Sequence, residues 1–126
     1  MDHTKSTTVT EIFTAEAIAK SGTAYSQIFG VKKLTGNASI QIELTGDGTG
    51  KFEWVGSNDE DAAVADFIKP NNANDIVTAF TDASGPGADG KHIYPFSVTL
   101  VSRFAIKVTE TTTTDAIAVT AQLALQ

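Results

Sequence analysis

Apolar and polar residues alternate through residues 39–55, SIQIELTGDGTGKFEWV, and this alternation constrains the fold more than any other feature of the chain. A period of two is typical of a strand with one buried and one wet face. The glycine-rich residues 46–50 supply the positive φ angles that a tight reversal needs. We therefore expect a β-hairpin here. Because an isolated two-stranded ribbon is only marginally stable in water, further sheet must cover its apolar face. The expected inward residues are Ile40, Ile42, Leu44, Phe52 and Trp54.

The same short period recurs along most of the chain, with turn signals every eight to twelve residues. This spacing predicts an all-β fold, a single antiparallel β-sandwich or jelly roll of about seven to nine short strands. Pro95 interrupts one of the expected strands and so favours an edge strand or a corner there. The other expected strands cover residues 9–13, 25–31, 64–68, 75–81, 93–100, 102–109 and 116–125.

Some local assignments depend on finer detail. Ile12 and Phe13 are adjacent, so in a regular strand their side chains fall on opposite faces. Residues 15–20 fit a helical turn or an edge strand, and the turn signal that follows at once favours the strand. In the strand 102–109, alternate positions face inward and outward. The inward set is Phe104, Ile106 and Val108, and the outward set is Arg103, Ala105 and Lys107.

At 126 residues the chain has the length of one ordinary domain. Residues 1–8 are polar and threonine-rich, and they predict a mobile N-terminal arm before a single sandwich domain at 9–126. The first residues lack the apolar segment of a signal peptide, and no apolar run reaches the roughly 20 residues that span a bilayer. We expect neither export nor membrane insertion.

The formal net charge of −6 argues against nucleic acid and anionic lipid as partners, since binding either depends on lysine and arginine. Most of the excess of negative charge lies in residues 43–66, which contain seven acidic residues and one lysine, so one rim of the protein should be acidic. That rim fits either a basic partner or, as the simpler explanation, a solvated surface. The absence of cysteine excludes disulfides and thiolate chemistry.

We find no pattern that predicts catalysis or a cofactor. Ser84, Asp89 and His92 supply the residue types of a triad, but no G-x-S-x-G elbow surrounds the serine. Zinc needs three or four ligands at defined spacing, which two histidines do not provide. The run Asn58-Asp59-Glu60-Asp61, or Asp82 with Asp89, offers oxygen ligands for calcium without the EF-hand spacing, so hydrated turns are the expectation.

Two aromatic residues raise a different possibility. Sugar-binding modules stack pyranose rings on exposed aromatic side chains, and Trp54 and Tyr94 are candidates for this role. The single tryptophan of a small domain is more often part of the core, which is the interpretation we favour for Trp54. A carbohydrate-binding module at a tail or host-contact position therefore stays as the alternative function.

Several segments resemble small virion proteins of tailed bacteriophages, of the type that decorates or cements the capsid. The resemblance spans about three quarters of the chain and is weakest over the first 25 residues and over 61–70. Its motifs are structural and not catalytic. They are GTGKFEWVGSND at 48–59, SGPGADGKHIYPF at 84–96, RFAIKVTET at 103–111 and DAIAVTAQLALQ at 115–126.

The resemblance implies a non-enzymatic β-sandwich protein on the capsid surface of a virion. Its expected partners are the major capsid protein and sister subunits, commonly in a homotrimer. A threonine-rich edge and arm are suited to pairing with a neighbour's strand. The candidate assembly contacts are Thr7, Thr8, Val9, Ile12, Phe13, His92 and Tyr94.

Overall fold

The computed structural model describes residues 7–31, 35–71, 73–98 and 101–126. Nine strands and one short 3₁₀ turn, η1, make up its regular structure. The strands are β1 (Thr8–Ile18), β2 (Thr23–Tyr25), β3 (Phe29–Gly30), β4 (Asn37–Thr45), β5 (Gly50–Ser57), β6 (Val77–Phe80), β7 (Lys91–Ser97), β8 (Arg103–Glu110) and β9 (Ile117–Leu125), and η1 covers Val64–Asp66.

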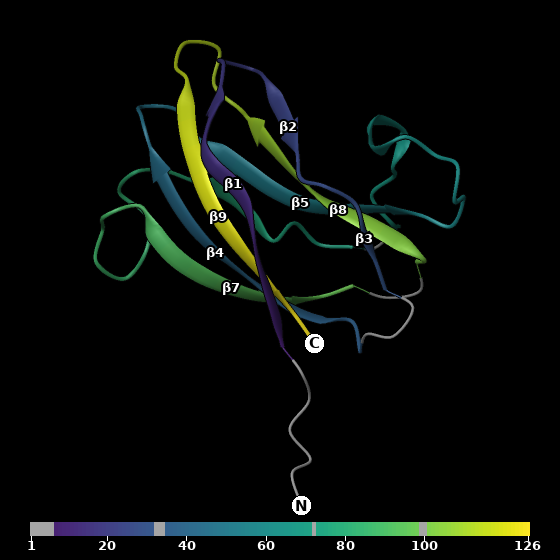
Figure 1. The fold of residues 1–126 in the computed structure, drawn as a ribbon. Helices are drawn as coiled ribbons and strands as arrows, with labels where there is room; N and C mark the ends of the chain where they lie inside the picture. Colours follow the sequence, from purple (N-terminus) through teal and green to yellow (C-terminus); the bar gives the residue numbers. More distant parts are fainter. Residues whose placement is uncertain (1–6, 32–34, 72, 99–100) are drawn as a thin grey trace, which may run out of the picture.

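The strands form two antiparallel sheets packed face to face, which confirms the predicted all-β sandwich. Sheet A has the order β1-β9-β4-β7, and sheet B has the order β2-β8-β5-β6 with β3 also paired to β8. Figure 1 shows β1, β9, β4 and β7 as one layer and β2, β8 and β5 as the other. Both ends of the described chain lie at the same end of sheet A, since Thr8 of β1 pairs with Leu125 of β9.

The strand order is that of a jelly roll. The two short strands β2 and β3 pair with opposite ends of β8 and act as one interrupted strand. The interruption is bridged by Ser26, whose N–H donates to the Ile106 carbonyl while its Oγ accepts the Ile106 N–H. With β2 and β3 counted together, each sheet has four strands, and the chain crosses between the sheets at nearly every connection.

The predicted hairpin at residues 39–55 is wrong in one respect. Both strands exist and their expected inward residues are buried, but β4 belongs to sheet A and β5 belongs to sheet B. The glycine-rich turn therefore joins the two sheets as an arch, and β4 pairs with β7 and β9 instead of with β5. Hairpin and arch bury the same alternate side chains, so the alternation does not distinguish them.

The core fills the space between the sheets. The inward residues predicted for β4 and β8 are all buried, and Trp54 is 6% exposed, so it belongs to the core as expected. Phe52 and Phe80 meet edge to face, with ring centroids 6.1 Å apart. The residues with essentially no exposed surface include Ile40, Ile42, Phe52, Phe80, Phe104, Ile106, Val108, Val119 and Leu123.

Ile12 and Phe13 depart from the predicted alternation, because both are buried in the core. The pairing of β1 with β9 shifts register between Glu11 and Phe13 and again between Phe13 and Glu16. These β-bulges insert extra residues into β1 and reset which side chains face inward. The expectation of opposite faces for this pair is therefore wrong.

The loop after β5 also differs from the prediction. The strand expected at 64–68 is instead the turn η1, followed by a single bridge between Ile68 and Gly56. This loop covers the outer face of sheet B. Ala105 faces outward as predicted, but it is buried there against Val55 and Phe67 and is not exposed to solvent.

Arg103 fastens this loop to sheet B. Its Nη1 donates to the carbonyl oxygens of Asp59, Glu60 and Ala62 at 2.8–3.2 Å. Its guanidinium lies 5.3 Å from the centre of the Phe67 ring.

The predicted arm of residues 1–8 lies mostly outside the described residues. Thr7 is described and exposed, and Thr8 already belongs to β1. Within the described ranges, no helix has the length and apolar character that crossing a membrane requires.

Gly48 provides a test of how tightly the arch is packed. A Cβ at this position would lie 2.6 Å from Oε2 of Glu110 and 2.9 Å from the Asp115 carbonyl. We predict that Gly48→Ala lowers the free energy of unfolding by about 1–3 kcal/mol through overpacking. Gly30→Ala is the control, because a Cβ there meets nothing within 4 Å. Urea denaturation of both variants measures the difference, and equal stabilities would contradict the packing.

Candidate assembly interface and polar clusters

The edge of sheet A formed by β1 is the longest strand edge that the structure offers to a partner. β1 has 11 residues and pairs with β9 on one side, with no strand on its other side among the described residues. Unpaired N–H and C=O groups on such an edge form a template for another strand. Thr8 to Glu11 pair with β9 in regular register. The bulges interrupt the edge only from Glu11 onward.

Exposure along β1 divides the candidate contacts into two groups. Thr7 and Thr8 are exposed, and Val9 is 63% exposed, so it offers an apolar contact beside the free edge. Ile12 and Phe13 are buried, so their side chains stabilise the core and only their backbone lies at the edge. An assembly role for side chains at Thr7, Thr8 and Val9 stays a prediction.

The opposite edge of sheet A is β7, as Pro95 indicated. His92 and Tyr94 pair with Ile42 and Ile40, so both lie on the inward parity and are half-buried. Their rings are 4.5 Å apart, and Tyr94 meets Phe80 edge to face at 6.1 Å. Burial raises the pKa of the Tyr94 phenol. These two candidates therefore pack chiefly against their own subunit.

Ile93 is an exposed large apolar residue of β7 that the sequence analysis passed over. It is 54% exposed, because it pairs with Gln41 on the outward parity. Its position between His92 and Tyr94 was a usable signal, since an apolar residue on the outward parity has no core to enter.

The polar groups considered for catalysis or calcium are engaged in local turns. The Ser84 hydroxyl accepts the Thr81 N–H at 2.9 Å. Asp59 Oδ1 accepts the Asp61 N–H at 2.9 Å, which closes the acidic turn. In the described ranges, no group of three or more His, Asp or Glu side chains is placed to hold a metal ion.

Glu110 is the most unusual polar residue in the structure. It is 1% exposed, and it is not among the ion pairs of the described chain. Oε2 accepts the Thr49 N–H at 2.8 Å, and Oε1 accepts the Ser21 N–H at 3.1 Å and the Thr112 hydroxyl at 2.8 Å. One carboxylate thus ties together the β1–β2, β4–β5 and β8–β9 connections.

These hydrogen bonds keep the buried carboxylate ionised. Burial by itself raises the pKa of Glu110, but the donors from Thr49, Ser21 and Thr112 more than offset it and lower the pKa to about 2. Near neutral pH the group acts as an acceptor and not as a proton donor. The sequence held a signal for this site, because Glu110 continues the inward parity of Phe104, Ile106 and Val108.

A second polar cluster lies on the outer face of sheet B. The Lys69 ammonium contacts Asp75 and lies 3.4 Å from Glu53, while Lys51 lies 3.8 Å from Glu53 and 4.0 Å from Asp75. The hydrogen bond between Lys69 and Asp75 lowers the pKa of the Asp75 carboxyl and raises the pKa of the Lys69 ammonium. Two cations and two carboxylates leave this cluster with no net charge.

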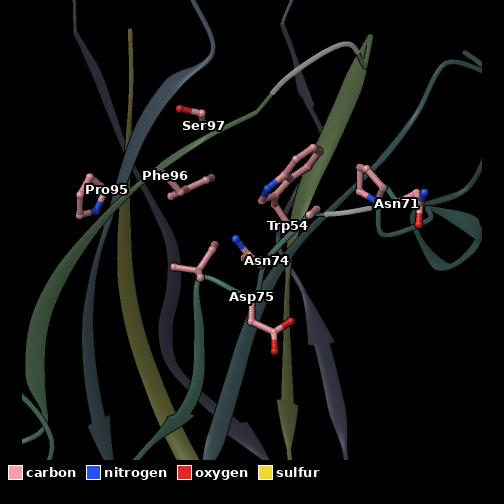
Figure 2. A pocket seen from close by; sticks show the side chains of 10 residues that line it. Trp54, Asn71, Asn74, Asp75, Pro95, Phe96 and Ser97 are labelled. Atoms are coloured by element: carbon pink, nitrogen blue, oxygen red, sulfur yellow. The ribbon is translucent and has the colours of Figure 1, made fainter.

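A pocket of about 540 Å³ opens beside this cluster, between the edges of the two sheets. Trp54 of β5 and Phe96 of β7 contribute aromatic carbon, and Asn71, Asn74 and Ser97 contribute polar groups. Figure 2 shows Asn74 between Phe96 and Trp54, with the Asp75 carboxylate turned away from both rings. Trp54 therefore forms a pocket wall and not the exposed platform of the carbohydrate-binding alternative.

Comparisons with known proteins identify no family for this chain. No protein-family model matches it, and no curated protein matches its sequence. The SPBc2 prophage-derived protein YomS is similar in structure, with a TM-score of 0.43, 12% identity and coverage of 99% of this chain and 98% of that chain. A chain of infectious bursal disease virus Gx strain gives a TM-score of 0.49 and 9% identity, over 95% of this chain and 31% of that chain. Both similarities are too distant to assign a function.

The Glu110 site predicts a specific dependence of stability on pH. Because the folded-state pKa of about 2 lies below the ordinary value of 4.5, its contribution is present above about pH 4.5 and is lost as the pH falls towards 2. We predict that Glu110→Gln lowers the free energy of unfolding by about 2 kcal/mol at pH 7. It should also flatten the loss of stability between pH 4.5 and 2, measured by denaturation at each pH.

Glu43→Gln is the matched control for this prediction. Glu43 is exposed on the outer face of sheet A, so its neutralisation should leave both the stability at pH 7 and the acid dependence close to those of the native protein. An acid dependence of Glu110→Gln identical to that of the native protein would show that the carboxylate does not hold the three connections.

Proposed function

We propose that this protein is a non-enzymatic virion structural protein that decorates or cements the head of a tailed bacteriophage through protein–protein contacts. The observation that carries the proposal is the open edge at Thr8–Glu11. This end of β1 pairs regularly with β9 and contains the exposed Val9. The resemblance of residues 48–59, 84–96, 103–111 and 115–126 to small phage virion proteins supports it. The jelly-roll order is compatible with this role but does not imply it, because one fold serves many functions.

The edge favours partners that bring a strand of their own. Main-chain hydrogen bonds along an edge give affinity without a deep pocket, and exposed side chains beside it add specificity. Val9 supplies an apolar contact, and neighbouring Thr7 and Thr8 supply hydroxyl groups. We propose the major capsid protein and sister subunits in a homotrimer as these partners, with the capsid surface as the location.

The outer face of sheet A offers a second contact surface for such a role. Mostly small or uncharged side chains cover its centre, with the exposed Glu43 opposite Thr120, so most of the face is suited to lie flat against another protein. Ile93 adds an apolar group at its β7 border. The central residues on this face are Ser39, Gln41, Ala118, Thr120, Gln122 and Ala124.

A charge placed on the open edge tests the proposal. We predict that Val9→Lys leaves the free energy of unfolding within about 0.5 kcal/mol of the native value, because the side chain is exposed. The same change should sharply reduce occupancy on undecorated phage heads, since lysine on an edge disfavours strand pairing. Co-sedimentation with heads measures the occupancy.

Ile68→Lys is the matched control, because Ile68 is 72% exposed on the loop that covers sheet B, away from the β1 edge. It should bind heads as the native protein does. Equal occupancy of Val9→Lys and native protein would exclude the β1 edge as the contact, and failure of the native protein to bind any head would exclude the proposed function.

Removal of residues 1–7 tests the contribution of the N-terminal arm separately from that of the β1 edge. The deletion stops before Thr8, the first paired residue of β1, so the fold should keep its melting temperature. We predict weaker head binding and a smaller mass than a trimer in native mass spectrometry. A truncated protein that stays trimeric and occupies heads fully would contradict a role for the arm.

A further inference from the structure

The pocket at Trp54 exists because β5 lacks a partner along part of its length. On the β6 side, β5 is held at Phe52, which pairs with Val77, and at Gly56, which bridges to Ile68. Trp54 lies between these two points, where the chain leaves the sheet as a loop and returns. The ion pair of Lys69 with Asp75 joins the two ends of that loop. The pocket thus results from the way the chain leaves and rejoins the edge of sheet B.

Its lining combines two kinds of surface. Trp54 and Phe96 come from opposite sheets and border the same space (Figure 2), but most of the aromatic carbon is that of the half-buried Phe96, because Trp54 is 6% exposed. Asn71 and Asn74 are exposed, and their side-chain amides make no hydrogen bond to the described part of the chain. Amides and the Ser97 hydroxyl both donate and accept hydrogen bonds. This combination matches a ligand with an apolar ring face and hydroxyl groups around its rim.

The charges near the pocket exclude strong selection for an ion. Lys51 and Lys69 are each within 4.0 Å of a carboxylate, so the adjoining cluster is neutral. The Asp75 carboxylate turns towards that cluster and away from the aromatic rings (Figure 2). The volume of about 540 Å³ lies within the usual range of small-molecule sites.

We propose that this pocket binds an uncharged saccharide, with the sugar ring against the half-buried Phe96, next to the small exposed part of Trp54, and its hydroxyls bonded to Asn74. The site is separate from the β1 edge and does not depend on the virion role. A head-bound protein with this activity would hold the particle near glycan-bearing surfaces.

The single tryptophan of the chain makes the proposal directly measurable. Titration with glucose, galactose, mannose, N-acetylglucosamine and their disaccharides should give a saturable change in Trp54 emission, and a shift of its indole N–H resonance, for at least one sugar. Asn74→Ala should weaken that binding about tenfold, the effect of one lost hydrogen bond. Its melting temperature should not change, because the side chain is exposed.

Asn37→Ala is the matched control, since Asn37 is an exposed asparagine outside this pocket, and it should bind as the native protein does. If Asn74→Ala melts early, Ser97→Ala on the facing wall replaces it as the test, with weaker binding again expected. The absence of a saturable response to every sugar would overturn the proposal. Equal sugar affinity of Asn74→Ala and the native protein would also overturn it. A change of Trp54 emission on addition of phage heads but not of any sugar would overturn it as well.

Discussion

Burial of two apolar surfaces against each other is the interaction on which the rest of this structure depends. Alternate residues of β4 and β9 in sheet A face alternate residues of β5 and β8 in sheet B, and the largest of them have almost no exposed surface. Because most of the large apolar side chains are used in this way, the outer face of sheet A is left mostly with small and polar groups, while the loop after β5 covers Val55 and Ala105 on the outer face of sheet B. Besides the outer face of sheet A, the places left for recognition are the borders of the sheets: the free edge of β1, the β7 edge, and the gap beside Trp54.

The connections at one end of the sandwich are held by a different interaction. Glu110 ends a buried strand and accepts hydrogen bonds from three separate connections. A single carboxylate therefore holds these connections together, as strand pairing holds the sheets together. An ionised group is retained in a buried position because its donors replace the water that it loses. Arg103 has a comparable role at the other end of β8, where it fastens the loop after β5. Both ends of β8 therefore anchor irregular chain.

Sequence reasoning was most reliable where period and burial coincide. The inward residues of β4 and β8 were predicted correctly, as was the edge position of the Pro95 strand. It failed where bulges interrupt the period and bury both Ile12 and Phe13, and where a loop covers the outward-facing Ala105. For the candidate site, the polar clusters and the pocket at Trp54 were missed, because their members come from segments that are distant along the chain.

The sequence by itself determined that the chain is an all-β sandwich, since alternation fixes which side chains leave water and strand length follows from the turn residues. Only the tertiary structure decided which strands pair. The segment 39–55 illustrates the reason: an arch between sheets and a hairpin within one sheet bury the same residues, so the burial energy does not choose between them. Contacts with distant segments make that choice, here the pairing of β4 with β9 and the hold of Glu110 on Thr49. The open edge and the pocket follow from that choice and not from the local pattern.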